Sequence, residues 1–133
     1  MNIDGIIFDL DGTLWDSCRI VAESWGHTLR TKYGAQSVPT VAETHSIMGL
    51  TVAQIAERLF SGYGERALEI CTDCLREENA YIAAHGGGTP YPGLEELLRR
   101  LSGRCGLYIV SNCIDGYIPV SYTHLRAHET SQD

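Results

Sequence analysis

The sequence predicts an α/β fold, in which a parallel sheet is interrupted by an inserted block of helices. Short apolar segments at residues 3–8 and 105–110 are typical of buried strands, and each ends on polar residues. Roughly a hundred residues separate the two, whereas a strand–helix–strand unit needs only about 30. The intervening residues show helical periodicity, which predicts an insertion between the two strands of one sheet.

The first elements follow directly from the residue pattern. The β-branched run at 3–8 leads into Asp9, and the Asp-Gly-Thr that comes after Leu10 is typical of a loop. Residues 16–33 are predicted to form a helix that Gly34 ends. Its apolar face has a spacing of mostly three or four residues and consists of Val21, Ala22, Trp25, Leu29 and Tyr33.

The middle of the insertion is predicted to contain a loop and two more helices. Residues 35–50 are polar and include Pro39, so we expect them to be mostly loop. Thr51 and Gln54 have the spacing of a capping box, which marks the start of the second helix. Residues 64–84 are expected to form the third helix. The apolar stripes of these helices are Val52, Ile55, Ala56, Leu59 and Phe60, and then Leu68, Cys71, Cys74, Leu75 and Ile82.

The chain then returns to the sheet. Residues 85–90 contain three consecutive glycines and a proline, a composition typical of a linker or hinge. An amphipathic helix is predicted after Pro92, with Leu94, Leu97, Leu98 and Leu101 on one side and Gly103 at its end. The second apolar strand, 105–110, ends at Ser111 and Asn112.

Composition excludes several classes of partner. The chain has 133 residues and a net charge of −7, which argues against nucleic acid or an anionic membrane as the main partner. No apolar run approaches the roughly 20 residues that span a bilayer. The N-terminus lacks a secretory signal. The five cysteines are an odd number without a framework spacing, which favours reduced thiols and a cytoplasmic location.

Two carboxylates, Asp9 and Asp11, follow the first strand. In an open parallel sheet, ligands bind at the carboxyl ends of the strands. Two carboxylates so close together raise each other's pKa unless a cation lies between them. Mg²⁺ is such a cation, because it favours carboxylate and carbonyl oxygens as ligands. One carboxylate is then suited to nucleophilic attack and the other to proton transfer. Gly12 would let the backbone pass close to a ligand. A plain Asp-Gly turn is the alternative.

The surrounding sequence favours a catalytic role for Asp9 and Asp11 over a plain Asp-Gly turn. The string Ile-Ile-Phe-Asp-Leu-Asp-Gly-Thr-Leu, residues 6–14, resembles the signature of the haloacid dehalogenase superfamily of phosphohydrolases. Ser111 after an apolar strand resembles that family's second motif. The likeness covers residues 1 to about 119. It implies a Rossmann-like core from 1–15 and 86–119, of which about two strands are present, and a helical cap from 16–85.

The resemblance also implies roles for single residues. Asp9 would be the nucleophile that forms an aspartyl phosphate, and Asp11 the general acid/base. The Asp9 carboxylate and the Asp11 carbonyl would bind Mg²⁺. The phosphoryl group would be bound by Gly12, Thr13, Ser111 and Asn112, and Gly49 would lie at the tip of a cap loop that approaches the active site.

The presence of Asp11 implies phosphoryl transfer rather than dehalogenation, because dehalogenases of the superfamily have no acid at this position. The cap resembles the subgroup of phosphoglycolate phosphatase and β-phosphoglucomutase, which implies a small phosphorylated metabolite as substrate. A phosphatase of the phosphoglycolate phosphatase type is the leading expectation. A sugar-phosphate mutase and a non-catalytic fragment are the alternatives, and the sequence leaves the oligomeric state open.

Two further motifs of the superfamily are absent from the sequence, a lysine and a later acidic pair. Lys32, the chain's single lysine, lies in the first helix of the insertion. Residues 120–133 show no helix or strand period, and Val-Ser-Tyr-Thr-His-Leu-Arg-Ala-His-Glu-Thr resembles a translated sequencing adaptor. We therefore expect a truncated core with a non-native tail from residue 120 onward. A short native tail is the alternative. Such a chain would fold poorly, show little or no phosphatase activity and expose an unpaired sheet edge.

Overall fold

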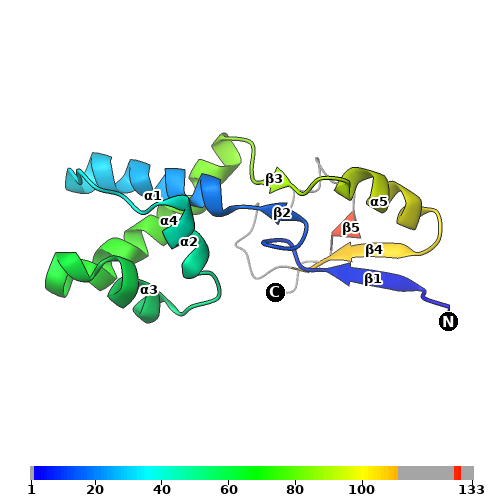
Figure 1. The fold of residues 1–133 in the computed structure, drawn as a ribbon, viewed down its shortest axis with the longest axis horizontal. Helices are drawn as coiled ribbons and strands as arrows, with labels where there is room; N and C mark the ends of the chain where they lie inside the picture. Colours follow the sequence, from blue (N-terminus) through cyan, green and yellow to red (C-terminus); the bar gives the residue numbers. More distant parts are fainter. Residues whose placement is uncertain (1, 111–127, 130–133) are drawn as a thin grey trace. The chain divides into compact units, whose positions relative to one another are not determined.

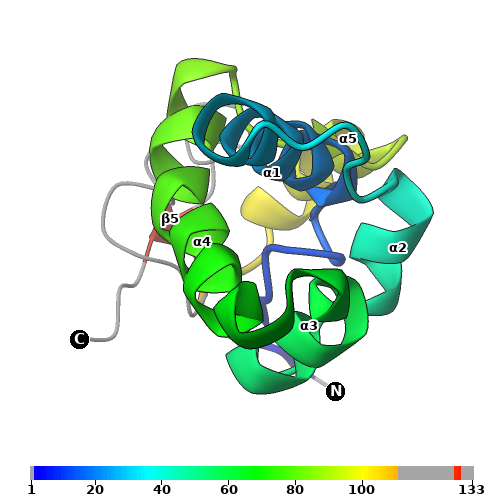
Figure 2. The same ribbon diagram turned by 90° about the vertical axis from the view of Figure 1, so that its left-hand side faces the viewer.

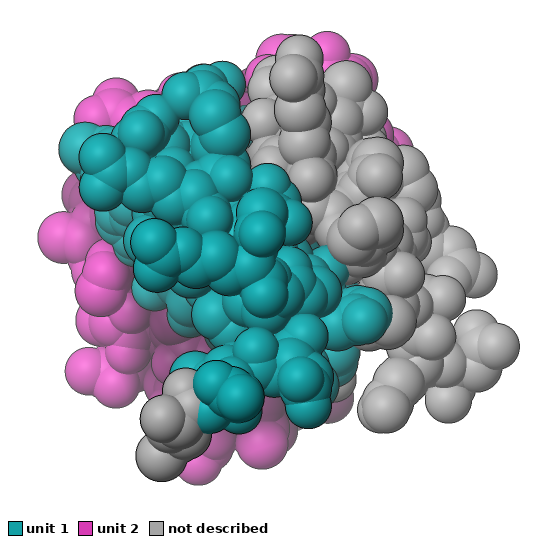
Figure 3. All heavy atoms as spheres, turned by 90° about the vertical axis from the view of Figure 1, so that its right-hand side faces the viewer, with its two compact units in different colours: residues 1–17, 86–133 teal, residues 18–85 magenta. Residues whose placement is uncertain are grey.

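The structure, a computed structural model, describes residues 2–110 and 128–129 (Figure 1). The chain divides into two compact units, which Figure 3 shows in different colours. Unit 1 combines residues 1–17 with 86–133, and unit 2 is the continuous segment 18–85. The segment 16–85 expected from the sequence as a cap therefore differs from unit 2 by two residues at its start. The function of unit 2 as a cap stays a prediction.

Unit 1 is built on a parallel sheet. Strand β1 (Gly5–Phe8) pairs in parallel with β4 (Gly106–Ile109), with Gly5 opposite Gly106 and Phe8 opposite Ile109. The two-residue strand β5 (His128–Glu129) pairs in parallel with the other edge of β4, which gives the order β1-β4-β5. The predicted parallel pairing of the two apolar segments is confirmed. The tail, expected to have no strand, contributes β5 because β4 offers it an open edge.

Helix α5 (Leu94–Ser102) covers one face of this sheet. Its residues Leu94 and Leu98 are buried, and so are Leu107 and Ile109 of β4, which α5 contacts. Leu97, which was expected on the same apolar side, is 48% exposed. Only Leu94 and Leu98, which are four residues apart on one side of the helix, are buried, because one row of side chains is enough to cover so short a sheet.

The opposite face of the sheet is open. Ile7 is 69% exposed and Tyr108, its neighbour in the register, is 38% exposed. The expectation that residues 3–8 form a buried strand is therefore wrong on this face. Alternate residues of a strand point to opposite faces, and α5 covers only one of the two.

A second, very short sheet joins the two segments of unit 1, which come before and after the helical insertion in the sequence. Strand β2 (Trp15–Asp16) pairs antiparallel with β3 (Thr89–Pro90). The predicted linker at residues 85–90 therefore ends in a strand. Gly86 and Gly87 have φ values of 86° and 82°, which a side chain would strain, so glycine is required there.

Unit 2 is entirely helical. It contains α1 (Cys18–Tyr33), α2 (Val41–Ser46), α3 (Val52–Leu59), the 3₁₀ helix η1 (Ser61–Arg66) and α4 (Ala67–Ala84). Helices α1 and α4 lie side by side in both ribbon views (Figures 1 and 2). The core consists of the residues that these helices bury, among them Trp25, Leu29, Phe60, Ile70 and Ile82.

Two details of unit 2 differ from the sequence prediction. Residues 41–46 form α2 within the expected loop, because Thr40 and Glu43 make a complete capping box. The inward face of α4 includes Ile70, which is 1% exposed, whereas Leu68 points outward and is 54% exposed. Among the described residues, no helix is long and apolar enough to cross a membrane.

Candidate functional site

The first candidate site lies where β1 ends. Asp9 directly follows the strand and is exposed, whereas Leu10 is fully buried and anchors the turn. The carbonyl of Leu10 accepts hydrogen bonds from the amides of Thr13 and Leu14, across 3.2 and 2.9 Å. This buried anchor fixes the backbone of the turn, and the Asp9 carboxylate remains open to solvent.

Gly12 and Thr13, expected to bind a phosphoryl group, both use their amides within this turn. Gly12 has a φ of 78°, and its amide donates to the carbonyl of Trp15 across 2.9 Å. The amide of Thr13 is bonded to Leu10. Glycine is required at position 12 because a Cβ would strain this conformation. The binding role of these amides stays a prediction.

The side chain of Asp11 is held by an aromatic donor. The indole Nε1 of Trp15 donates to Asp11 Oδ1 across 2.9 Å, and the Trp15 ring is fully buried. The backbones of Asp11 and Trp15 also form an isolated β-bridge. Trp15 is a site residue that was not predicted from the sequence. The signal was available, because a tryptophan four residues after an acid can reach back across a tight turn.

The second candidate motif follows β4. The amide of Val110 donates to the carbonyl of Phe8 across 2.9 Å, so the pairing of β1 and β4 continues to their carboxyl ends. Parallel strands end at the same edge of a sheet, so β4 ends at the edge where Asp9 follows β1. Ser111 and Asn112 themselves lie outside the described residues.

The carboxylates of the turn fit part of a magnesium site. Mg²⁺ is usually held by one or two carboxylates, substrate phosphate and several waters. Asp9 offers an exposed carboxylate of this kind, and Asp11 offers a main-chain carbonyl two residues on. No group of three or more His, Cys, Asp or Glu side chains with metal-binding geometry occurs in the described part of the chain. The donor set fits a cation that substrate and water help to hold.

Gly49, the last sequence-predicted site residue, belongs to unit 2. It has a φ of 82°, and a Cβ built on it would meet no atom within 4 Å. Only the backbone conformation therefore requires glycine here. The loop follows the end of α2 at Ser46, and the capping box of Thr51 and Gln54 fixes the start of α3 after it. Within the loop, the amide of Leu50 donates to the carbonyl of Ile47 across 3.1 Å. The role of Gly49 near a ligand stays a prediction.

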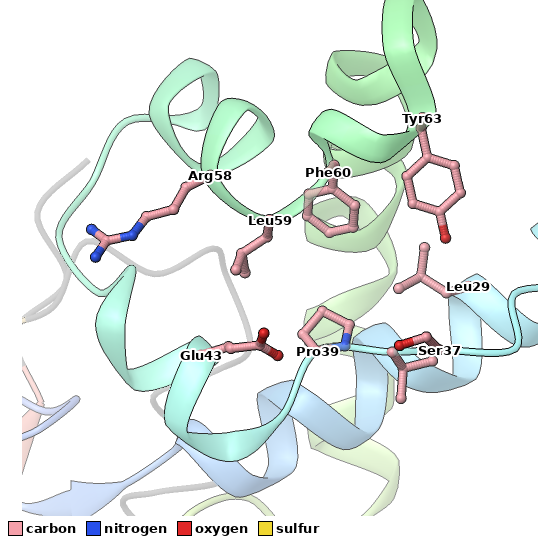
Figure 4. Close-up of a pocket in the computed structure, with 9 residues that line it drawn as sticks. Leu29, Ser37, Pro39, Glu43, Arg58, Leu59, Phe60 and Tyr63 are labelled. Carbon is pink, nitrogen blue, oxygen red and sulfur yellow. The ribbon is translucent and has the colours of Figure 1, made fainter.

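A cavity of about 140 Å³ lies within unit 2 (Figure 4). Arg58, Leu59, Phe60 and Tyr63 line it from the end of α3 and from η1, and residues 37–39 with Glu43 line it from the facing segment. None of the site residues predicted from the sequence lines this cavity. It is an opening between the helices of unit 2.

The cysteine pair of α4 is not a reactive site. Cys71 and Cys74 are both fully buried. Burial raises the pKa of the Cys74 thiol to about 12, and burial also raises that of Cys71. A thiol that keeps its proton at neutral pH is a poor nucleophile and a poor metal ligand. The two side chains fill the core of unit 2.

A comparison with protein families identifies the chain. Residues 6–130 match the family model described as haloacid dehalogenase-like hydrolase. The chain belongs to this family. The match begins within β1 and includes Asp9, Asp11 and the strand β4. The haloacid dehalogenase-like fold therefore accounts for the parallel sheet and for the long helical insertion between β1 and β4.

Solved structures of this family share the fold. A haloacid dehalogenase-like hydrolase from Streptococcus pneumoniae superimposes with a TM-score of 0.70 and 22% identity over 98% of this chain and 62% of its own. A predicted phosphoglycolate phosphatase from Haemophilus somnus superimposes with a TM-score of 0.67 and 20% identity. The match covers 94% of this chain and 60% of that protein. A protein assigned as a β-phosphoglucomutase from Thermotoga maritima superimposes with a TM-score of 0.62 and 18% identity. The match covers 97% of this chain and 61% of that protein.

These relatives are longer than this chain, which spans about 62% of the Streptococcus protein. At such identities the likeness shows the fold of the chain. No curated protein sequence matches it significantly. The expected Rossmann-like core with a helical insertion is confirmed as the fold class.

Proposed function

We propose that the chain is the nucleophile-bearing part of a Mg²⁺-dependent phosphatase that acts on a small phosphorylated metabolite. The observation that carries this proposal is the arrangement of the two acids after β1. Asp9 is exposed at the carboxyl end of a parallel strand, and Asp11 is held by the buried indole of Trp15. The two carboxylates of one turn thus have different surroundings, as two different roles require.

In the proposed reaction Asp9 is the nucleophile. One of its carboxylate oxygens bonds to phosphorus while the phosphorus–oxygen bond of the ester breaks, and Asp11 donates a proton to the departing oxygen. A water molecule then attacks the phosphorus and gives its proton to Asp11. The bond between Asp9 and phosphorus breaks, which releases phosphate and restores both acids.

The cation would be held by the Asp9 carboxylate and the Asp11 main-chain carbonyl. When bound, Mg²⁺ would balance the charge that the phosphoryl oxygens and Asp9 bring together. Gly12, Thr13, Ser111 and Asn112 are proposed to bind the phosphoryl group. Gly49 is proposed to lie near the substrate when the helical unit acts as a cap. A cytoplasmic location fits the free cysteines.

A phosphoglycolate phosphatase-like activity is the first choice, because Asp11 supplies a proton and the neighbouring structures include proteins named for that activity. A sugar-phosphate mutase is the alternative that the Thermotoga neighbour favours. Product analysis separates the two. Phosphoglycolate would yield free phosphate under the first proposal, whereas β-glucose 1-phosphate would yield glucose 6-phosphate under the second.

The 133-residue chain itself is proposed to turn over little or no substrate. The two acids of the turn are the only carboxylates that we assign to its phosphoryl site, and Lys32, the one lysine of the sequence, lies in unit 2. Charge at the phosphoryl group is therefore poorly balanced. A non-catalytic fragment that still binds a phosphoryl mimic is the remaining alternative for this chain.

The decisive experiment compares the chain with a version extended by the C-terminal region that its genomic locus encodes. Hydrolysis of p-nitrophenyl phosphate with Mg²⁺ is expected from the extended protein, and Asp9→Asn is expected to abolish it. Asp4→Asn, a change of the same kind at an exposed carboxylate before β1, is the matched control and should leave the rate unchanged. Full activity in extended Asp9→Asn would refute the nucleophile assignment.

Beryllium fluoride tests whether the short chain forms the site. It mimics a phosphoryl group on an aspartate, and a ligand that binds only the folded state raises the melting temperature. With Mg²⁺ present, we expect thermal stabilisation that is lost in Asp9→Asn and kept in Asp4→Asn. Stabilisation without turnover would identify the chain as a binding fragment.

A further inference from the structure

Both segments of unit 1 fix the indole of Trp15. The ring is fully buried. The amide of Gly12 donates to the Trp15 carbonyl across 2.9 Å, and strand β2 pairs Trp15 with Pro90 of β3. A Cβ built on Gly88 would lie 2.8 Å from Cδ2 of the ring, so the backbone of Gly88 packs directly against the indole. The ring therefore has little freedom to rotate.

This fixed ring donates a hydrogen bond to the second acid of the turn. Nε1 of Trp15 lies 2.9 Å from Oδ1 of Asp11, and the backbones of the two residues form a β-bridge. Asp11 is half-buried. A carboxylate can adopt several rotamers, and a donor on a fixed ring favours the rotamer that brings Oδ1 within its reach. Trp15 thus determines the direction in which Asp11 presents its carboxyl group.

The hydrogen bond also distinguishes the two oxygens of Asp11. A protonated carboxyl group has one hydroxyl oxygen and one carbonyl oxygen. The carbonyl oxygen is the better acceptor, so the bond to the indole favours Oδ1 as the carbonyl and places the acidic proton on Oδ2. In the reaction proposed above, this is the proton that passes to the departing oxygen.

We propose that Trp15 is a positioning residue that directs the acidic proton of Asp11 toward the oxygen that leaves the phosphate ester. The inference rests on the function proposed above. Asp9 bonds to phosphorus, and the electron pair of the breaking phosphorus–oxygen bond stays on the departing oxygen. That oxygen takes the proton from Oδ2 of Asp11 and leaves as an alcohol. Asp11 becomes a carboxylate, and its Oδ1 still accepts from the indole.

The need for a directed proton depends on the leaving group. An alkoxide departs readily only when it is protonated as the bond breaks, whereas p-nitrophenolate is stable as an anion. Loss of the indole donor should therefore slow the cleavage of alkyl esters and hardly affect that of p-nitrophenyl phosphate. A purely structural role of Trp15 would slow the cleavage of both esters alike.

The test compares benzyl phosphate with p-nitrophenyl phosphate in the extended protein, with Mg²⁺ present. The readout is kcat/KM, which reports the steps up to and including the cleavage of the ester. Trp15→Phe keeps an aromatic ring but removes the donor. We expect a fall of at least about 10-fold for benzyl phosphate, part of the roughly 10²- to 10⁴-fold that general acid catalysis contributes, and of less than about 3-fold for p-nitrophenyl phosphate.

Trp25→Phe is the matched control. Trp25 is also buried, and its Nε1 donates to the carboxylate of Glu78 across 2.7 Å, but it belongs to unit 2. The same change there removes an equivalent hydrogen bond, so any loss of stability should be similar. The ratio of kcat/KM for the two esters should stay at the value of the parent protein. Circular dichroism shows whether each variant retains its helices.

An analogue that keeps the shape of the ring separates the donor from the packing. In β-(3-benzothienyl)alanine, sulfur replaces the indole N–H. Residue 18 is a cysteine, so a synthetic segment 1–17 that carries the analogue at position 15 can be joined to the rest of the chain by native ligation. The analogue should lower kcat/KM for benzyl phosphate as Trp15→Phe does. Cleavage at the rate of the parent protein would show that the hydrogen bond plays no part.

A double-mutant cycle shows whether Trp15 acts through Asp11. Asp11→Asn alone should lower kcat/KM for benzyl phosphate by more than Trp15→Phe does. Adding Trp15→Phe to Asp11→Asn should cause no further loss, because the effects of residues that act through one group are not additive. Losses that multiply would contradict the proposed coupling.

Further results would overturn the inference alone. They are equal losses for both esters with the ring analogue, faster cleavage of benzyl phosphate in Trp15→Phe, and the same change of ratio in Trp25→Phe. An extended parent protein that cleaves neither ester, or whose activity survives Asp9→Asn, would refute the proposed function and this inference with it. A loss confined to benzyl phosphate, with an unchanged ratio in Trp25→Phe, would support the positioning role of Trp15.

Discussion

The indole Nε1 of Trp15 donates a hydrogen bond to Asp11 Oδ1 across 2.9 Å. Trp15 is fully buried, and it is the first residue of β2, so its position is fixed by the pairing with β3. The acid proposed to transfer protons is therefore tied to the short sheet that flanks the helical insertion. This contact relates the proposed chemistry of the turn to the packing of unit 1.

Replacing Asp11 by alanine is expected to lower the free energy of unfolding by about 1–3 kcal/mol. The buried indole N–H of Trp15 would lose this acceptor, and a buried donor left without its partner is destabilising by that amount. Urea denaturation measures the change. Asp9→Ala is the control, because Asp9 is exposed, and a surface change of this kind should fall within about 0.5 kcal/mol.

A spectroscopic readout separates this contact from general destabilisation. Both tryptophans of the chain donate to carboxylates, Trp15 to Asp11 and Trp25 to Glu78. In Asp11→Asn, the indole proton resonance of Trp15 should move upfield, because an amide oxygen is a weaker acceptor than a carboxylate. The Trp25 resonance should stay in place. Movement of both signals, or of neither, would contradict the assignment.

Gly88 is predicted to tolerate no side chain. A Cβ at this position would lie 2.8 Å from Cδ2 of Trp15 and 3.0 Å from the carbonyl oxygen of Asp16. Trp15 is buried and cannot yield, so Gly88→Ala should destabilise the fold by about 1–3 kcal/mol, as overpacking does. Gly62→Ala is the matched control, because a Cβ there meets nothing within 4 Å, and its unfolding midpoint should not fall.

Much of the fold could be predicted because local pattern and tertiary structure agree. The apolar runs at 3–8 and 105–110 are too short and too β-branched for helices, and they pair in parallel as expected. The capping box of Thr51 and Gln54 predicts the first residue of α3 correctly. The box formed by Thr40 and Glu43 has the same spacing, but Pro39 and the polar composition of residues 35–50 favour a loop, so α2 was not predicted.

Other features depend on contacts that a single sequence does not contain. The choice between Leu68 and Ile70 as the inward residue of α4 depends on how α4 is rotated against α1. The exposure of Ile7 depends on what else covers the sheet, which no property of Ile7 reveals. In the candidate site, the spacing of Asp9 and Asp11 is enough to predict both residues. The hydrogen bond from Trp15 to Asp11 could not be predicted in this way, because it depends on the shape of the turn that joins the two residues.

Ser24 offers a stabilising substitution. It is fully buried in α1, and its hydroxyl has no hydrogen-bond partner among the described residues. Ser24→Ala removes an unsatisfied polar atom and also improves helix propensity, so a gain of about 1 kcal/mol is expected. Ser46→Ala is the control, because the exposed Ser46 hydroxyl donates to the carbonyl of Glu43 across 2.7 Å. Thermal unfolding should show a higher midpoint for Ser24→Ala only.

The contact between Tyr33 and Asp73 should make the stability of unit 2 depend on pH in both directions. The hydroxyl of Tyr33 donates to the Asp73 carboxylate, which joins α1 to α4. This bond raises the pKa of Tyr33 to about 12 and lowers the pKa of Asp73. The contribution of Asp73 is therefore present above the ordinary aspartate pKa and is lost as pH falls through the lowered value. The contribution of Tyr33 is present below pH 10 and is lost as pH rises toward 12.

Tyr33→Phe tests this dependence. At neutral pH its urea midpoint should lie below that of the parent chain, because the carboxylate of Asp73 loses a donor. The difference should shrink as the solution is acidified, because protonated Asp73 gains little from the hydroxyl in the parent chain. Tyr63→Phe is the matched control, since Tyr63 lines the cavity of unit 2 rather than bonding to Asp73, and its midpoint should follow the parent chain at every pH. A Tyr33→Phe difference that is constant from neutral to acid pH would show that packing, and not the charged hydrogen bond, carries the effect.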